Sequence, residues 1–275
     1  MMAKKTFLIA TMFVVGCYSG MDSELELGER EQFADEEVDE IVENLIAADY
    51  PEEEIEVLDD NTVLVGGDAV VTLDASREMI GLDSGDGEDV GFRQYRTNNL
   101  VNNGQTLTVI GYTANNSNGL DNTAQTALQW AVNNYNSLNI GLNFQLSYGT
   151  NYQDKDIVVY RVDGPGGGQA GFPSGGNPYK WVQIQGGTSN YGTNVVEHVI
   201  GHEIGHAIGL RHTDYFDRSL SCGSGGNEGG GSAGAIHIPG TPTGTDYNSL
   251  MQACFSASED GEFGPEDIDA LEFLY

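Results

Sequence analysis

The spacing of hydrophobic residues changes from helical to strand-like within the first hundred residues. From Phe33 to Asp49 the apolar positions recur every three or four residues, which predicts one amphipathic helix that Pro51 ends. Three short β-branched runs with turn-forming residues between them predict strands over 55–58, 62–65 and 69–73. We therefore expect a small α+β unit of about 60 residues, which is marginal in size for independent folding.

Strands and helices alternate in the rest of the chain before helices and loops dominate. Four β-branched or aromatic runs predict strands: 106–112, 144–148, 156–162 and 181–185. Three stretches are expected as helices: one that Asp121 caps and that runs to about Tyr135, 193–210 in spite of its glycines, and 267–275 behind Pro265. Residues 221–246 form a glycine-rich loop. This order predicts an α+β or α/β domain with one sheet.

Charge divides the chain near residue 92. The 275 residues include 42 acidic and 11 basic side chains, and residues 18–92 hold 25 of the acidic and 2 of the basic ones. Such a step predicts two units of different character. The formal net charge of −31 disfavours nucleic acid and anionic membrane surfaces as partners, and its general effect is solubility. We expect a monomer.

The first 17 residues are typical of an export signal, with Lys4 and Lys5 before an apolar run from Phe7 to Val15. That run is too short to span a bilayer, and no later stretch is apolar for long enough. The ending Val14-Val15-Gly16-Cys17 resembles a bacterial lipobox. The resemblance implies cleavage before Cys17, lipidation of its thiol and a membrane-anchored protein. The alternative is an ordinary signal peptide and a secreted product.

Two other cysteines, Cys222 and Cys254, lie in the C-terminal part. In an exported chain they are expected to form a disulfide, and two free structural thiols are the alternative.

The candidate chemistry lies in the segment from His202 to His212. Because residues four apart share one face of a helix, His202 and His206 can place two imidazole nitrogens on one ion. Gly209 can take a left-handed conformation and end the helix, so that His212 turns back towards the same ion. Three neutral imidazoles suit a zinc ion and leave a fourth position for water, which is the arrangement of a catalytic site.

Glu203 adjoins the first histidine and can reach that water without being a ligand, so we expect it to be the general base. His198 lies four residues before His202 on the same stripe. Three positions along a straight helix cannot surround one ion, and we therefore expect His198 to support the site or the core rather than to bind metal.

At this point the sequence resembles the metzincins, the metallopeptidases in which an extended histidine motif precedes a methionine-containing turn. Met251 occupies the position of that turn. The chain is more specifically similar to the bacterial dual-action HEIGH metallopeptidases over roughly residues 60–275. That similarity rests on His202-Glu203-Ile204-Gly205-His206, supported by three further segments: 65–68, 93–97 and 238–242.

The resemblance implies an α+β, metzincin-like catalytic domain. Its parts would be a mixed twisted sheet, a long backing helix, an active-site helix, a Met-turn with Met251 as a hydrophobic base, and a C-terminal helix. It further implies that the strand 181–185 is the sheet edge on which an extended substrate lies.

Some positions depart from related enzymes. Thr213 follows His212 where other metzincin subfamilies have Glu, Ser or Pro, and Ala253 stands where some place a tyrosine ligand. We therefore expect three protein ligands, one water and no fourth side chain on the zinc. The segment Asp163–Gly168 resembles a matrixin metal-binding loop. It implies either a calcium site or a turn-rich connection.

Together these features predict a signal peptide over 1–17, an acidic propeptide-like region over 18–92 and a zinc metallopeptidase domain over 93–275. The expected activity is that of a zinc endopeptidase, exported as an inactive precursor, with protein or peptide substrates. An aspartate from Asp83–Asp89 is one candidate for covering the site, and a simple spacer or folding aid is its alternative. The competing functions are a surface zinc-binding lipoprotein with a binding or adhesion role and a zinc amidase acting on cell-wall material.

Overall fold

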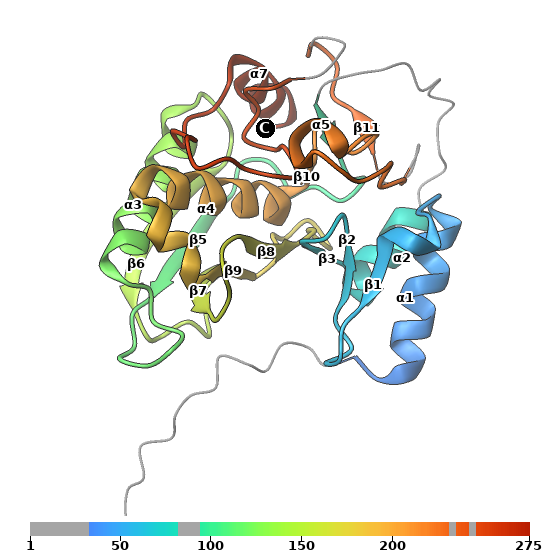
Figure 1. The fold of residues 1–275 in the computed structure, drawn as a ribbon, viewed down its shortest axis with the longest axis horizontal. Helices are drawn as coiled ribbons and strands as arrows, with labels where there is room; N and C mark the ends of the chain where they lie inside the picture. Colours follow the sequence, from blue (N-terminus) through green and yellow to red (C-terminus); the bar gives the residue numbers. More distant parts are fainter. Residues whose placement is uncertain (1–32, 82–93, 231–234, 242–245) are drawn as a thin grey trace, which may run out of the picture. The chain divides into compact units, whose positions relative to one another are not determined.

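The computed structural model describes residues 33–81, 94–230, 235–241 and 246–275 (Figure 1). The export signal, Cys17, the Asp83–Asp89 stretch and the predicted boundary at residue 92 lie outside these ranges. Residues 32–275 form one unit. No helix within the described ranges is long and apolar enough to cross a membrane.

A mixed sheet of eight strands organises this unit, in the order β1-β2-β3-β8-β9-β7-β5-β6. Its strands are β1 (Ile55–Val57), β2 (Val63–Val65), β3 (Ala69–Val70), β5 (Thr106–Tyr112), β6 (Asn143–Gly149), β7 (Ile157–Val162), β8 (Gly168–Gly171) and β9 (Trp181–Gln185). Strands β5, β6, β7 and β9 are parallel, whereas β8 runs antiparallel to β9. The predicted α+β class with a mixed sheet is confirmed.

Helices complete the fold (Figure 1). They are α1 (Asp35–Ala47), α2 (Leu73–Gly81), α3 (Asn122–Ser137), α4 (Thr193–Ile208), the short α5 (Ser219–Cys222) and α7 (Pro265–Leu274), with 3-10 turns η1 (Glu52–Glu54) and η2 (Gly186–Tyr191). A second small sheet has the order β10 (Leu210–Arg211), β4 (Tyr95–Arg96) and β11 (Ile236–His237).

The main core lies between the sheet and the helices α3 and α4. Ala127, Leu128 and Ala131 of α3 and Ile200 and Ile204 of α4 are fully buried in it. The Tyr135 hydroxyl also donates a hydrogen bond to the Gly201 carbonyl at 2.8 Å, which ties α3 directly to α4. This packing holds α4 rigidly in the body of the protein.

A second core joins α1, α2 and the strands β2 and β3. The α2 helix was not expected, because its sequence Leu-Asp-Ala-Ser-Arg-Glu-Met-Ile-Gly carries few apolar residues; Met79 and Ala75 are nevertheless fully buried. Phe172, which follows β8, belongs to this second core. The N-terminal elements therefore pack against the rest of the unit.

The prediction that 181–185 is the edge strand is wrong. The strand β9 lies between β7 and β8, and β8 pairs on its other side with β3 in parallel register. The β8 sequence Gly-Gln-Ala-Gly has no β-branched residue and so gave no strand signal. Among the sheet strands that follow residue 94, β8 is therefore the last one next to the N-terminal strands, and its outer edge pairs with β3.

Asp121 caps α3 as the sequence predicts, since its Oδ1 accepts a hydrogen bond from the Ala124 amide at 2.9 Å. We expect Asp121→Ala to lower the free energy of unfolding by about 1 kcal/mol, because the first turn of the helix loses its acceptor. Denaturant unfolding measures this, with Asp154→Ala at an exposed loop position as the control. Equal stability of the two variants would contradict the capping role.

Candidate metal centre

The helix α4 is buried along almost its whole length. Its glycines Gly201 and Gly205 allow the turn that carries Met251 to approach it closely. A Cβ atom on Gly205 would meet the Met251 Sδ at 2.5 Å, and one on Gly201 would meet the Leu250 Cδ2 at 3.1 Å. Met251 is 1% exposed. The turn that carries Met251 therefore packs directly beneath the helix turn that carries the histidines.

Gly209 ends α4 with a positive φ of 116°, and its amide donates to the carbonyls of Gly205 and His206. The chain then enters β10, whose pairing with β4 directs His212 back towards the helix. The Nε2 atom of His212 lies 3.2 Å from that of His206 and 3.3 Å from that of His202. The structure thus brings together all three predicted metal ligands.

The outer nitrogen of each ring has a partner. His202 Nδ1 lies 2.9 Å from the Leu250 carbonyl, His206 Nδ1 lies 2.9 Å from the Leu210 carbonyl, and His212 Nδ1 lies 2.6 Å from Glu228 Oε1. Because these partners are acceptors, each Nδ1 is placed to donate a hydrogen bond, which leaves each Nε2 on the inward side for a metal ion. Two nitrogens bound to a tetrahedral zinc ion lie about 3.3 Å apart, so the donor set fits this metal.

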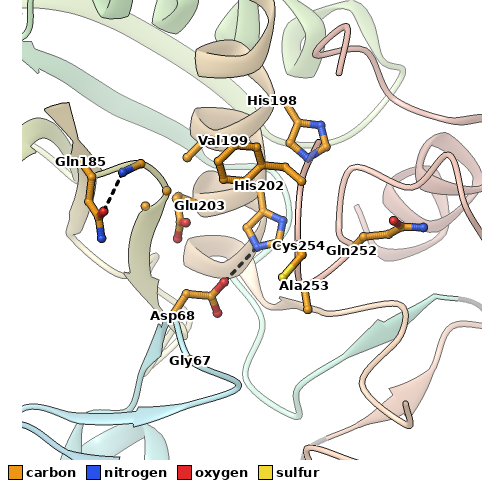
Figure 2. Close-up of a pocket in the computed structure, with 14 residues that line it drawn as sticks. Gly67, Asp68, Gln185, His198, Val199, His202, Glu203, Gln252, Ala253 and Cys254 are labelled. Atoms are coloured by element: carbon orange, nitrogen blue, oxygen red, sulfur yellow. Dashed lines mark hydrogen bonds and ion pairs between the residues drawn. The ribbon is translucent and has the colours of Figure 1, made fainter. Parts of the chain in front are cut away.

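Asp68 is a fourth donor at the same point. It ends the turn between β2 and β3, and its Oδ2 lies 3.2 Å from His212 Nε2. The same oxygen lies 3.5 Å from His202 Nε2, a contact that Figure 2 shows. Its Oδ1 lies 3.6 Å from His206 Nε2 and has no hydrogen-bond partner. The four ligand atoms lie within 4.8 Å of one another. This differs from the expected three protein ligands and one open position.

Glu203 lies beside the histidines without joining this cluster. It is buried, its Oε2 has no partner, and Gly168 of β8 approaches it so closely that a Cβ there would meet its Oε1 at 2.5 Å. Burial raises the pKa of Glu203 well above its usual range, and the charge of Asp68 adds to this rise. Glu203 therefore has the surroundings of a proton-transfer group.

Burial and neighbouring charges also shift the pKa values of the histidines and of Asp68. Burial lowers the pKa of His206 to about 3, which keeps this imidazole in the neutral form that binds metals. Burial also lowers the pKa of His212, but the carboxylates of Asp68 and Glu228 outweigh it and hold that pKa well above its usual value. The same histidine contributes most to lowering the pKa of Asp68 against the effect of burial.

A cleft of about 280 Å³ opens beside this cluster. Figure 2 shows Gln185 on one side of Glu203 and Ala253 and Cys254 on the other. Cys254 is joined to Cys222 in a disulfide, which ties the cleft wall to α5. The cleft is thus walled by the loop before β8, by α4 and by the segment after Met251.

His198 lines this cleft but lies outside the metal-ligating cluster. Its ring centroid is 6.5 Å from that of His202, and its Nδ1 is 3.8 Å from Glu259 Oε2. Burial lowers its pKa to about 4, so the ring is neutral. Calcium at Asp163–Gly168 stays a prediction; Asp163 itself lies 3.6 Å from Arg161 Nη1.

Three imidazoles converge beside a buried carboxyl group, and two of them lie on a helix that packs over a methionine turn. This arrangement is typical of a metal-dependent hydrolase. The family model described as dual-action HEIGH metallopeptidase matches residues 63–275. The chain belongs to this family and is a metallopeptidase. Two solved structures of myroilysin are each 14% identical to it with a TM-score of 0.42, covering 64% of this chain and 82% and 86% of theirs. A search of curated proteins found no match.

Sequence reasoning missed Asp68 and Glu228. The segment 65–68 supported the family resemblance, and a Gly-Gly-Asp turn after a β-branched strand was the available signal for a projecting carboxylate. Glu228 lies in a loop of glycines and polar residues that has no periodicity. Only the folded loop brings it to His212, so no local pattern could have identified it.

Gly209→Ala is expected to cost about 1–3 kcal/mol of stability for the left-handed conformation, and more because its Cβ would meet the Asn99 carbonyl oxygen at 2.5 Å. Since the turn positions His212, the affinity for zinc should fall as well. Gly104→Ala is the control, because Gly104 has a φ of 82° and open space around it. If both variants bind zinc equally well, Gly209 does not position the third ligand.

Proposed function

We propose that the protein is a zinc-dependent endopeptidase made as an inactive precursor. The observation that carries this proposal is the convergence of three Nε2 atoms, with separations of 3.2–3.3 Å between His212 and the other two histidines. His202, His206 and His212 would hold the zinc ion. A bound zinc ion acidifies a water molecule and polarises a peptide carbonyl group.

Glu203 would be the general base of peptide hydrolysis. Its buried carboxylate lies beside the histidines and is not engaged by them, so it can accept a proton from the attacking water and return it to the leaving amine. The raised pKa of Glu203 supports the second role, because the carboxyl group then holds a proton long enough to deliver it.

The shape of the cleft supports action on internal peptide bonds. Its walls extend on both sides of Glu203, towards Gln185 and towards Ala253 (Figure 2). A chain can therefore lie across the metal site rather than ending there. The strand β8 pairs with β3 in this structure. If β3 were displaced, an extended substrate could pair with the same backbone groups of β8.

The precursor form is supported by the β2–β3 turn, which lies in the cleft. Asp68 is the fourth donor at the metal site, and Gly67 lines the cleft beside it. The strand β3 meanwhile takes the free edge of β8, with the Ala170 amide donating to the Asp68 carbonyl at 3.2 Å. A substrate would need both the metal site and the edge of β8. The N-terminal elements occupy these two places, so they and a substrate exclude each other. This turn takes the covering role suggested for Asp83–Asp89.

Export and lipid anchoring through Cys17 are part of the same proposal. They are supported by the lipobox-like Val14–Cys17 and by the Cys222–Cys254 disulfide, since disulfides persist in oxidising compartments. The two rival functions, a binding lipoprotein and a cell-wall amidase, share the metal site but differ in substrate. Absence of any peptide hydrolysis after removal of the N-terminal elements would favour the first rival.

In the Asp68→Ala background, in which the proposed covering carboxylate is absent, we expect Glu203→Gln to lower kcat for casein or peptide hydrolysis at least about a hundredfold, because the proton acceptor is lost. The zinc content should stay unchanged, since Glu203 is not one of the four donors. The matched control is Glu197→Gln, another buried glutamate of α4 that contacts Asn134 instead of the site. Unchanged hydrolysis by the Glu203 variant would rule out its role as the base.

Asp68→Ala in the full chain should increase both peptide hydrolysis and the affinity for a hydroxamate inhibitor by at least about tenfold. The reason is that a tethered ligand competes at an effective concentration in the millimolar range. Isothermal titration with the inhibitor gives a readout that does not depend on turnover. Asp74→Ala, at an exposed position of α2, is the control. Equal inhibitor affinity of the wild type and the Asp68 variant would refute the covering role.

A further inference from the structure

Glu228 is a buried carboxylate that directly contacts a metal ligand from outside the donor set. Its side chain is 1% exposed, and its backbone amide donates to the Tyr215 carbonyl at 2.7 Å. The Oε1 atom accepts a hydrogen bond of 2.6 Å from His212 Nδ1, and Oε2 accepts one of 3.0 Å from the Arg211 guanidinium. Both of its oxygens are therefore engaged by two consecutive residues, Arg211 at the end of β10 and His212 just after it.

This contact differs from those of the other two ligands. His202 and His206 donate to the backbone carbonyls of Leu250, next to Met251, and of Leu210 in β10. His212 has no such carbonyl and donates to a charged group instead. A hydrogen bond to a carboxylate is about twice as strong as one between neutral groups, and it makes the opposite nitrogen a better metal donor.

The position of Glu228 is itself fixed by buried neighbours. Arg211 also donates to the Tyr50 hydroxyl at 2.7 Å, and its guanidinium lies 5.0 Å from the ring centroid of Tyr50 and 5.6 Å from that of Tyr215. On the other side, the turn at Gly66 lies so close that a Cβ there would meet the Glu228 carboxylate at 3.0–3.2 Å. The carboxylate is therefore held by two hydrogen bonds and by the close approach of Gly66.

We propose that Glu228 is the positioning residue of the third metal ligand. It holds the hydrogen of His212 on Nδ1 and fixes the ring plane, so that Nε2 presents its lone pair to the metal. His212 needs this support more than the other ligands do, because it lies in a loop after β10 and not on the rigid helix α4. The inference rests on the proposed zinc site and adds a residue to it.

The test measures the zinc affinity of the full chain by competition with a chelator, for the wild type and for Glu228→Ala and Glu228→Gln. We expect Glu228→Ala to weaken zinc binding 10- to 100-fold. Glu228→Gln keeps an acceptor oxygen and should recover part of this loss. Glu197→Gln, at a buried glutamate of α4 outside the metal-ligating cluster, should bind zinc like the wild type. The visible spectrum of the cobalt-substituted protein should change only in the Glu228 variants.

A paired variant separates positioning from folding, because Glu228→Ala leaves the buried Arg211 without its carboxylate. Arg211→Met combined with Glu228→Met removes both charges, a replacement that is often neutral for stability. It should still fold by circular dichroism and still bind zinc 10- to 100-fold more weakly. Wild-type affinity and an unchanged cobalt spectrum in this variant would overturn the inference while leaving the zinc site intact. If neither the wild type nor the Asp68→Ala variant binds zinc, both the role of Glu228 and the proposed zinc site are overturned.

Discussion

The site depends on one constraint, which is that three buried imidazoles must all point the same nitrogen at one place. A neutral histidine ring has one donor and one acceptor, and burial makes an unpaired donor costly. The structure meets this by giving each Nδ1 an acceptor from a different part of the chain: the Met-turn, the strand β10 and the loop at Glu228. The inward Nε2 lone pairs follow from these three hydrogen bonds. Metal binding and the folding of distant segments are thereby coupled.

Glycine makes this arrangement possible in a crowded interior. Gly205 lets the methionine turn approach α4, Gly168 lets β8 approach Glu203, and Gly66 lets the β2–β3 turn approach Glu228. A Cβ atom at Gly205 or Gly168 would come within 2.5 Å of the neighbouring side chain, and one at Gly66 would make a tight contact of 3.0–3.2 Å. The glycines weaken helix and strand propensity locally, but tertiary packing of the buried faces outweighs that loss. The β2–β3 turn can therefore come close to the site, where the carboxylate of Asp68 meets the histidines.

Much of the fold and the centre of the site could be predicted from local patterns. The spacing of His202, His206 and Gly209 specifies a helix and its end, and the Asp121 cap specifies where α3 begins. What local patterns could not supply was pairing between distant segments. The strand β8 is stabilised by its neighbours rather than by its own Gly-Gln-Ala-Gly sequence, and its presence moved 181–185 from the edge to the interior. Asp68 likewise reaches the site only through the pairing of β3 with β8.

The central claim is that His202, His206 and His212 hold one zinc ion, with Asp68 completing the set in the full-length chain. X-ray absorption spectroscopy of the zinc-loaded full chain tests this most directly. The account predicts one zinc per chain, with three imidazole nitrogens at about 2.0–2.1 Å and one carboxylate oxygen at a similar distance. When Asp68 is replaced by alanine, a water oxygen should take the place of the carboxylate oxygen. The three imidazole nitrogens should stay unchanged. A zinc ion with fewer than three imidazoles, or no stoichiometric zinc at all, would contradict the account.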